Sequence, residues 1–186
     1  MILYAIGDEH AIAAKAVNGC VYAEDDKNFE VIGKLAHPDN SHISWANKVA
    51  YALRMTVSIG EPSKSNTVIV ERITNWIASI SDQLSPDEVV IIVGWNAPEE
   101  NESTTLIRNF HIYLDQLGIK HAFFWTKEKH EIDYDFRGIF LTEVYVDYVK
   151  NNGHDHVIMS DEYFGNDAHT EWAKYLLLHI AQNAIF

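Results

Sequence analysis

The sequence opens with Ile2-Leu3-Tyr4-Ala5-Ile6-Gly7-Asp8-Glu9-His10 after Met1, and this stretch decides the fold that we expect. Its first five residues are apolar, which is typical of a parallel strand that is buried on both faces. Gly7 then ends the apolar run, and three polar residues follow it at once. Because ligands of open α/β sheets bind at the carboxyl ends of the strands, we expect the chemistry of this chain at Asp8, Glu9 and His10.

The rest of the chain alternates short apolar runs with amphipathic segments, a pattern that predicts an α/β fold. Further strands are expected at 55–59, 89–93 and 121–125, and helices at 45–53 (capped by Ser44), 65–84, 106–117 (ended by Gly118) and 170–184. Residues 133–152 mix strand and helix character. We therefore predict three layers, with about five parallel strands between helices.

Length and composition favour one domain spanning residues 1–186, because 47% of the residues are hydrophobic and no linker or repeat interrupts the chain. The net charge of −13 argues against nucleic acid and anionic membranes as partners. The single cysteine, Cys20, excludes an internal disulfide. No apolar run is long enough to cross a bilayer, and the N-terminus lacks the basic start of a signal peptide, so we expect a cytoplasmic protein. No motif indicates the oligomeric state.

Four short motifs follow expected strands or precede expected helices. They are Gly7-Asp8-Glu9-His10, Glu61-Pro62-Ser63-Lys64-Ser65-Asn66, Gly94-Trp95-Asn96-Ala97-Pro98 and Asp167-Ala168-His169. In this order they resemble the conserved blocks of the SGNH (GDSL-type) hydrolases, above all small SGNH-like proteins of tailed bacteriophages. The resemblance implies a flavodoxin-like fold, esterase or acyl-hydrolase activity on a small-molecule or glycan ester, and no cofactor or metal. If the protein is phage-encoded, it implies a place in the host cytoplasm or the virion.

The family mechanism implies roles for several of these residues. In the family a serine after the first strand attacks an acyl carbonyl, and a histidine oriented by an aspartate removes its proton. By resemblance, His169 is the base and Asp167 its orienting partner. The oxyanion donors are the side-chain amide of Asn96 and a backbone N–H from Gly60 or Ser63.

Other motif residues are candidates for substrate contact: Asp8, His10, Asn66 and Trp95. Among the tryptophans, only Trp95 is expected on a loop, where a ligand can reach it. The others named by helical spacing, Trp45, Trp76 and Trp172, are expected in the core. Structural alternatives stay open for the site residues, since Asn96 suits a turn and Asp167 suits a helix cap beside His169 in the first turn.

Glu9 is the main departure from the family, because it stands where the nucleophilic serine is expected. One interpretation is a non-catalytic member, a phage-type binding or structural protein that keeps the pocket. In a second, Glu9 acts as a base or carboxylate nucleophile in a rearranged site. In a third, Ser41, Ser44 or Ser63 supplies the hydroxyl from a loop.

A rival hypothesis is a metal-dependent phosphoesterase. Asp8 and His10 resemble the opening of that family, in which both residues bind one ion of a two-metal centre. Additional oxygen and imidazole ligands are Glu9, His42, Asp167 and His169. The later motifs of that family are missing from this sequence. The segment His154-Asp155-His156 is also capable of chelation, although a polar turn beside Gly153 is the commoner explanation.

Overall fold

A single parallel sheet forms the centre of the computed structural model, which describes residues 1–8, 44–98, 104–152, 164, 166–183 and 185. Its five strands lie in the order β2-β1-β3-β4-β5, and every neighbouring pair is parallel. The strands are β1 (Ile2–Ile6), β2 (Thr56–Ile59), β3 (Val89–Trp95), β4 (Lys120–Trp125) and β5 (Phe140–Val144). This order is the flavodoxin-like one, so the predicted fold class is confirmed.

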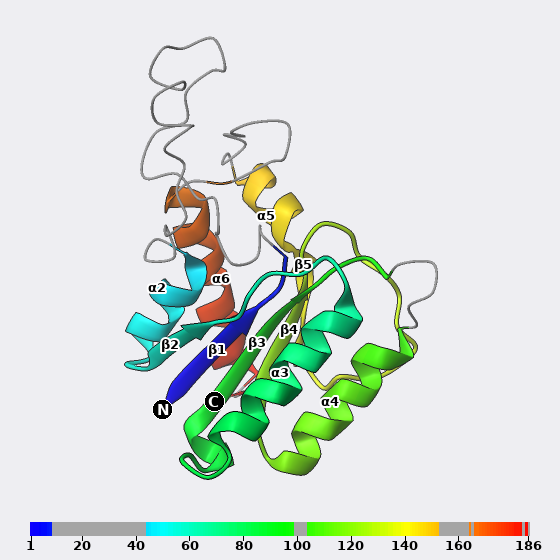
Figure 1. The fold of residues 1–186 in the computed structure, drawn as a ribbon. Coiled ribbons are helices and arrows are strands. Elements are labelled where there is room, and N and C mark those ends of the chain that lie inside the picture. Colours follow the sequence, from blue (N-terminus) through cyan, green and yellow to red (C-terminus); the bar gives the residue numbers. More distant parts are fainter. Residues whose placement is uncertain (9–43, 99–103, 153–163, 165, 184, 186) are drawn as a thin grey trace, which may run out of the picture.

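Helices cover both faces of the sheet (Figure 1). The helices are α2 (Trp45–Ala52), α3 (Asn66–Ile80), α4 (Thr105–Leu117), α5 (Tyr145–Asn151) and α6 (Asn166–Gln182), and a 3₁₀ turn, η2 (Pro86–Glu88), precedes β3. Helices α3 and α4 pack on one face, and α2, α5 and α6 pack on the other. Among the residues that the structure describes, no helix combines the length and the apolar character that crossing a bilayer requires.

Strand β3 shows why this sequence forms a two-sided core. All of its residues are buried, and most are β-branched. Val90 and Ile92 pack toward α2 and α6, whereas Ile91 and Val93 pack toward α3 and α4. A strand whose two faces are both covered needs apolar residues at every position, which explains its unbroken apolar run.

The expected elements are present, with shifted ends. Ser44 caps α2 by accepting a hydrogen bond from the Asn47 N–H at 3.2 Å. Gly118 ends α4 in the left-handed conformation, with φ of 70°, as a helix C-cap favours. Helix α3 ends at Ile80, one turn before the expected end, because the N–H groups of Gln83 and Leu84 close a turn on the Ile80 carbonyl.

Residues 133–152, which the sequence left ambiguous, contain both kinds of element. Strand β5 ends at Val144, and α5 begins at the next residue, Tyr145. The sequence pattern is mixed because a short strand, β5, is followed directly by a short helix, α5, with no loop between them. This junction lies at the carboxyl ends of the strands, and it delivers Tyr145 to the candidate site.

Candidate active site at the carboxyl edge of the sheet

Three buried polar side chains meet at the carboxyl edge, and we call Asp8, Tyr145 and His169 the carboxyl-edge cluster. Asp8 follows β1, Tyr145 opens α5, and His169 lies in the first turn of α6. The Tyr145 hydroxyl is 3.3 Å from His169 Nδ1. Burial and, after it, the charge of Asp8 raise the pKa of Tyr145 well above its ordinary value. Tyr145 is therefore a neutral phenol that contacts His169 and lies close enough to Asp8 to be affected by its charge.

Sequence reasoning missed Tyr145. It belongs to none of the four motifs and lies in the segment whose pattern was ambiguous. The signal available in the sequence was its place four residues after the short apolar run Ile139-Phe140-Leu141, where the carboxyl end of a strand brings side chains to the ligand edge.

The spacing of Asp167 and His169 does not favour the predicted pairing. The two residues are two positions apart on α6, and residues at that spacing do not face each other on a helix. Accordingly, Asp167 is exposed and His169 is buried. Burial lowers the pKa of Lys48 on α2, and the charge of Asp167 partly offsets that effect, so Asp167 acts on α2. The hydroxyl of Tyr145 instead lies beside Nδ1 of His169, the base that Asp167 was expected to orient.

The two backbone N–H groups predicted for the oxyanion hole are bonded to the β1 segment. The Gly60 N–H donates to the Ala5 carbonyl at 2.8 Å, and the Ser63 N–H donates to the Gly7 carbonyl at 3.0 Å. The loop after β2 thus continues the pairing of β2 with β1. Both N–H groups are already used in these backbone hydrogen bonds, so neither is available to an oxyanion. The prediction of an oxyanion donor at Gly60 or Ser63 is therefore wrong.

Glycine at position 60 allows that close approach. A Cβ atom there would lie 2.5 Å from Tyr4 Oη and 2.8 Å from Ile6 Cδ1. Such contacts are too short for any Cβ atom unless the buried side chains of Tyr4 and Ile6 shift. The Arg72 guanidinium holds the same loop from α3, donating to the Glu61 and Pro62 carbonyls at 2.8 and 2.7 Å.

Asn66 and Asn96 join the loop after β3 to the start of α3, and we call this pair the amide clasp. Asn66 Nδ2 donates to the Asn96 carbonyl, and the Asn96 N–H donates to Asn66 Oδ1, each at 3.0 Å. Asn96 Nδ2 in turn donates to the Ser63 carbonyl at 3.0 Å. Asn66 is buried and positions Asn96, so its predicted contact with substrate is replaced by a structural role.

Trp95 is the last residue of β3 and is fully buried, so the prediction that it forms a ligand platform on a loop is wrong. The strand extends to position 95 because Gly94 and Trp95 pair with Phe124 and Trp125 of β4. The indole packs edge-on against Phe110 and Phe123. Trp45 and Trp172 are buried in the core as expected, and Trp76 is partly buried against it.

Two of the three serines proposed as substitute nucleophiles have structural roles here. The Ser44 hydroxyl caps α2, and the Ser63 hydroxyl accepts the Ser65 N–H at 3.1 Å. Ser41 lies outside the described residues, and so do Glu9 and His10. The same holds for the ligand candidates His42, His154, Asp155 and His156. Among the residues that are described, the carboxyl edge holds no group of three metal-ligating side chains.

Comparison with known proteins adds one structural likeness. No family model matches the chain, and no curated protein matches it. A solved structure of a carbohydrate esterase, whose active site is described as displaying divergent catalytic and non-catalytic binding functions, is similar to it with a TM-score of 0.48 and 15% identity. The match covers 97% of this chain and 64% of that chain. At this identity and TM-score the likeness assigns no activity to this chain.

Proposed function

We propose that this chain is an SGNH-like domain that binds an ester-bearing small molecule or glycan at the carboxyl edge without hydrolysing it. One observation carries the proposal: the N–H groups of Gly60 and Ser63 both donate to carbonyls of the β1 segment. Acyl transfer needs donors aimed at the position where the oxyanion develops, and their loss typically costs about 10²–10³ in rate for each donor. The sequence adds Glu9 in place of serine.

Binding at this edge is supported by the polar groups that remain there. Asn96 Nδ2 carries two hydrogens, and the Ser63 carbonyl takes one of them. The second hydrogen is suited to the carbonyl of an ester. The amide clasp fixes the backbone of Asn96, which preorganises this donor at the place where ligands of open α/β sheets bind.

An ester-hydrolysing enzyme is the second candidate, and the contact between Tyr145 and His169 favours it. If His169 Nδ1 carries the proton and donates it to the Tyr145 oxygen, Nε2 is left as the basic atom. A general base needs this tautomer. Glu9 would then have to act in place of the serine, as base or carboxylate nucleophile.

The first test is hydrolysis of p-nitrophenyl acetate by the wild type, Glu9→Ser, His169→Ala and the Glu9→Ser/His169→Ala double variant. We expect no turnover above the background rate in any of them. Activity gained in Glu9→Ser and lost again in the double variant would contradict the proposal, because it would require a working oxyanion hole. Wild-type turnover that disappears in His169→Ala would establish the second candidate.

The second test measures binding directly. We expect 6-O-acetylglucose to give saturable amide shifts in NMR spectra of the wild type, and glucose to give weaker ones. Asn96→Asp replaces the donor with an acceptor, so it should weaken the binding at least tenfold. Asn75→Asp, an exposed change on α3, serves as the matched control. Equal shifts from both sugars, or equal binding by Asn96→Asp and Asn75→Asp, would refute an ester-binding site at Asn96.

A further inference from the structure

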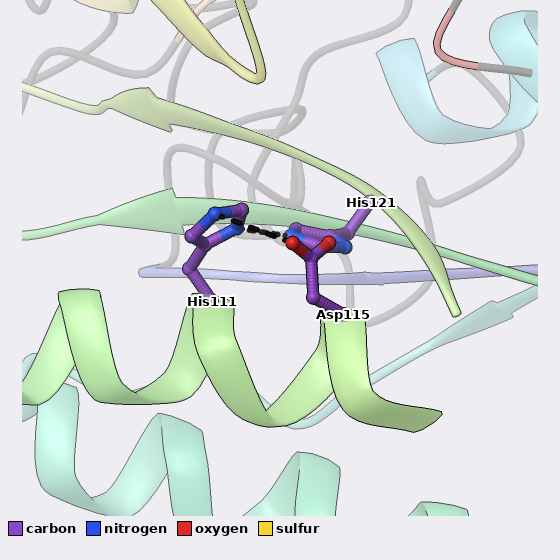
Figure 2. Close-up of side chains that lie close together, drawn as sticks. All are labelled: His111, Asp115 and His121. Atoms are coloured by element: carbon purple, nitrogen blue, oxygen red, sulfur yellow. Dashed lines mark hydrogen bonds and ion pairs between the residues drawn. The ribbon is translucent and has the colours of Figure 1, made fainter. Parts of the chain in front are cut away.

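A second cluster of polar side chains lies at the opposite end of the sheet. His111 and Asp115 are one turn apart on α4, and His121 is near the amino end of β4, on the sheet face that α4 covers. Figure 2 shows the three side chains pointing toward one another. One potential ligand atom from each lies within 4.8 Å of the other two. None of these residues belongs to the four sequence motifs.

The two histidines are core residues, with 3% and 2% of their surface exposed. His111 Nδ1 is 2.8 Å from His121 Nε2, and His121 Nδ1 is 2.8 Å from the Ile119 carbonyl oxygen. A carbonyl only accepts hydrogen bonds, so His121 Nδ1 carries its proton and Nε2 presents a lone pair. The backbone thereby selects the tautomer of His121 that is ready to bind a metal through Nε2.

The tautomer of His121 also fixes that of His111. Because its Nδ1 faces the lone pair of His121, Nδ1 carries the proton of the neutral ring, which leaves Nε2 as an acceptor. That bare Nε2 lies 3.7 Å from Asp115 Oδ2, so a lone pair faces a carboxylate. Burial lowers the pKa of both histidines below the ordinary value, which favours the neutral form that binds metals.

We propose that His111 Nδ1 and His121 Nε2 bind a divalent transition-metal ion, Zn²⁺ in the first instance, with Asp115 as the outer partner of His111. Imidazole nitrogen suits zinc over magnesium or calcium, and solvent completes the coordination shell. On binding, His111 Nδ1 becomes a ligand and its proton moves to Nε2, where it faces the carboxylate of Asp115. The ring then has a carboxylate partner and His121 a carbonyl partner, which is the usual outer arrangement of metal-bound histidines.

Space and access are consistent with this ion. Two nitrogens on one tetrahedral zinc stand roughly 3.3 Å apart, so the pair has to open by about half an ångström. A surface cavity of about 330 Å³ reaches His121 and Asp115, and it would admit the ion and the solvent ligands that complete the shell. The Asp115 side chain at this cavity is 58% exposed and therefore free to adjust.

Lys120 and Arg137 also line the cavity, and their charges oppose a cation. Arg137 acts on His111 in particular, since its charge contributes to the lowered pKa of that ring after the larger effect of burial. Removing this charge should therefore strengthen metal binding, which gives the proposal a variant with an effect of opposite sign.

The test is titration of the metal-stripped protein with ZnCl₂ by calorimetry. We expect one site in the wild type, binding at least about tenfold weaker in Asp115→Asn and several-fold tighter in Arg137→Gln. Both changes are at the cavity mouth, so they leave the core intact. Asp82→Asn, an exposed aspartate beyond α3, controls for the loss of one negative charge.

A second control addresses the histidine-rich segment. His154→Gln/His156→Gln should leave the affinity unchanged, whereas loss of binding in that variant, together with retention in Asp115→Asn, would place the metal elsewhere and overturn the proposal. The direct readout is the ¹⁵N signal of the His111 ring, expected to change from the Nδ1–H to the Nε2–H tautomer at saturating Zn²⁺. An unchanged tautomer would also overturn it. Neither result depends on the ester-binding proposal.

Discussion

The two ends of the sheet each bury histidine, but they surround it differently. At the carboxyl edge, His169 contacts the hydroxyl of Tyr145, and the nearby loops are joined by the amide clasp. At the amino end, Nδ1–H of His111 donates to Nε2 of His121, and the outer nitrogen of His111 faces a carboxylate beside a cavity. At the carboxyl edge the polar groups form hydrogen bonds with one another that hold the loops in place. At the amino end a nitrogen lone pair of His111 faces a carboxylate, and a bound cation would relieve that unfavourable contact.

This difference shows how to separate structural from ligand-binding polar groups. The sequence motifs drew attention to the carboxyl edge, yet several of their polar groups hold the loops together. The amino-end residues attract no attention as a motif, because their ligand atoms meet only when α4 packs on β4. A buried polar group indicates a ligand when its neighbours in the protein do not satisfy it. His111 is such a group, because the lone pair on its Nε2 faces the carboxylate of Asp115.

The largest effect should come from breaking the amide clasp. Asn66→Ala leaves the N–H and the carbonyl of Asn96 without their partners, so the free energy of unfolding should fall by about 2–3 kcal/mol in urea titrations. Asn75→Ala, on the exposed side of the same helix, should change it by less than about 0.5 kcal/mol. Similar values for the two variants would mean that the clasp contributes no net stability.

The next effect tests the amino end. A metal that binds only the folded state at 100 times its Kd raises stability by about 2.7 kcal/mol. At the same Zn²⁺ concentration, Asp115→Asn with tenfold weaker binding should gain only about 1.4 kcal/mol. Thermal unfolding with and without ZnCl₂ measures both gains. If Zn²⁺ stabilises Asp115→Asn as much as the wild type, the contrast between the two ends disappears.

The dependence of the free energy of unfolding on pH above about pH 9 tests the environment of Tyr145. Its pKa is raised in the folded state, so the stability it contributes is present below about pH 10 and is lost as pH rises beyond it, when the unfolded phenol ionises first. One such proton corresponds to about 1.4 kcal/mol per pH unit. Urea unfolding at about pH 9 and about pH 11 should show Tyr145→Phe losing less stability than the wild type. Parallel losses would indicate that Tyr145 is not buried as a neutral phenol.

The smallest effect is the loss of the Tyr145 hydroxyl at neutral pH. Tyr145→Phe keeps the ring in the core and removes the partner of His169 Nδ1, so the free energy of unfolding should fall by about 1 kcal/mol. Tyr51→Phe is a suitable control, because Tyr51 is exposed on α2 and should change stability by less than about 0.5 kcal/mol. A stabilised Tyr145→Phe would mean that the buried contact is strained and favours a functional role for it.

Local patterns were enough to predict the sheet and most of its helices. Unbroken apolar runs indicate strands covered on both faces, Ser44 and Gly118 act through their own backbone neighbourhoods, and helical spacing places Trp45 and Trp172 in the core. Each of these signals depends only on residues that are close together in the sequence, so it can be recognised without knowing the tertiary structure. The prediction failed for Trp95, because pairing with β4 extended the strand past the glycine that was expected to end it.

The candidate site was only partly predictable for the same reason. By itself, the sequence determined that Asp8, Asn96 and His169 follow strands or open a helix, and hence that they reach the carboxyl edge. Only the tertiary structure decided which partners they have there: Tyr145 for His169, Asn66 for the backbone of Asn96, and α2 for Asp167. It alone also brought His111 to His121, since hydrogen bonds between separate elements depend on how helices dock on the sheet, and no local pattern records that docking.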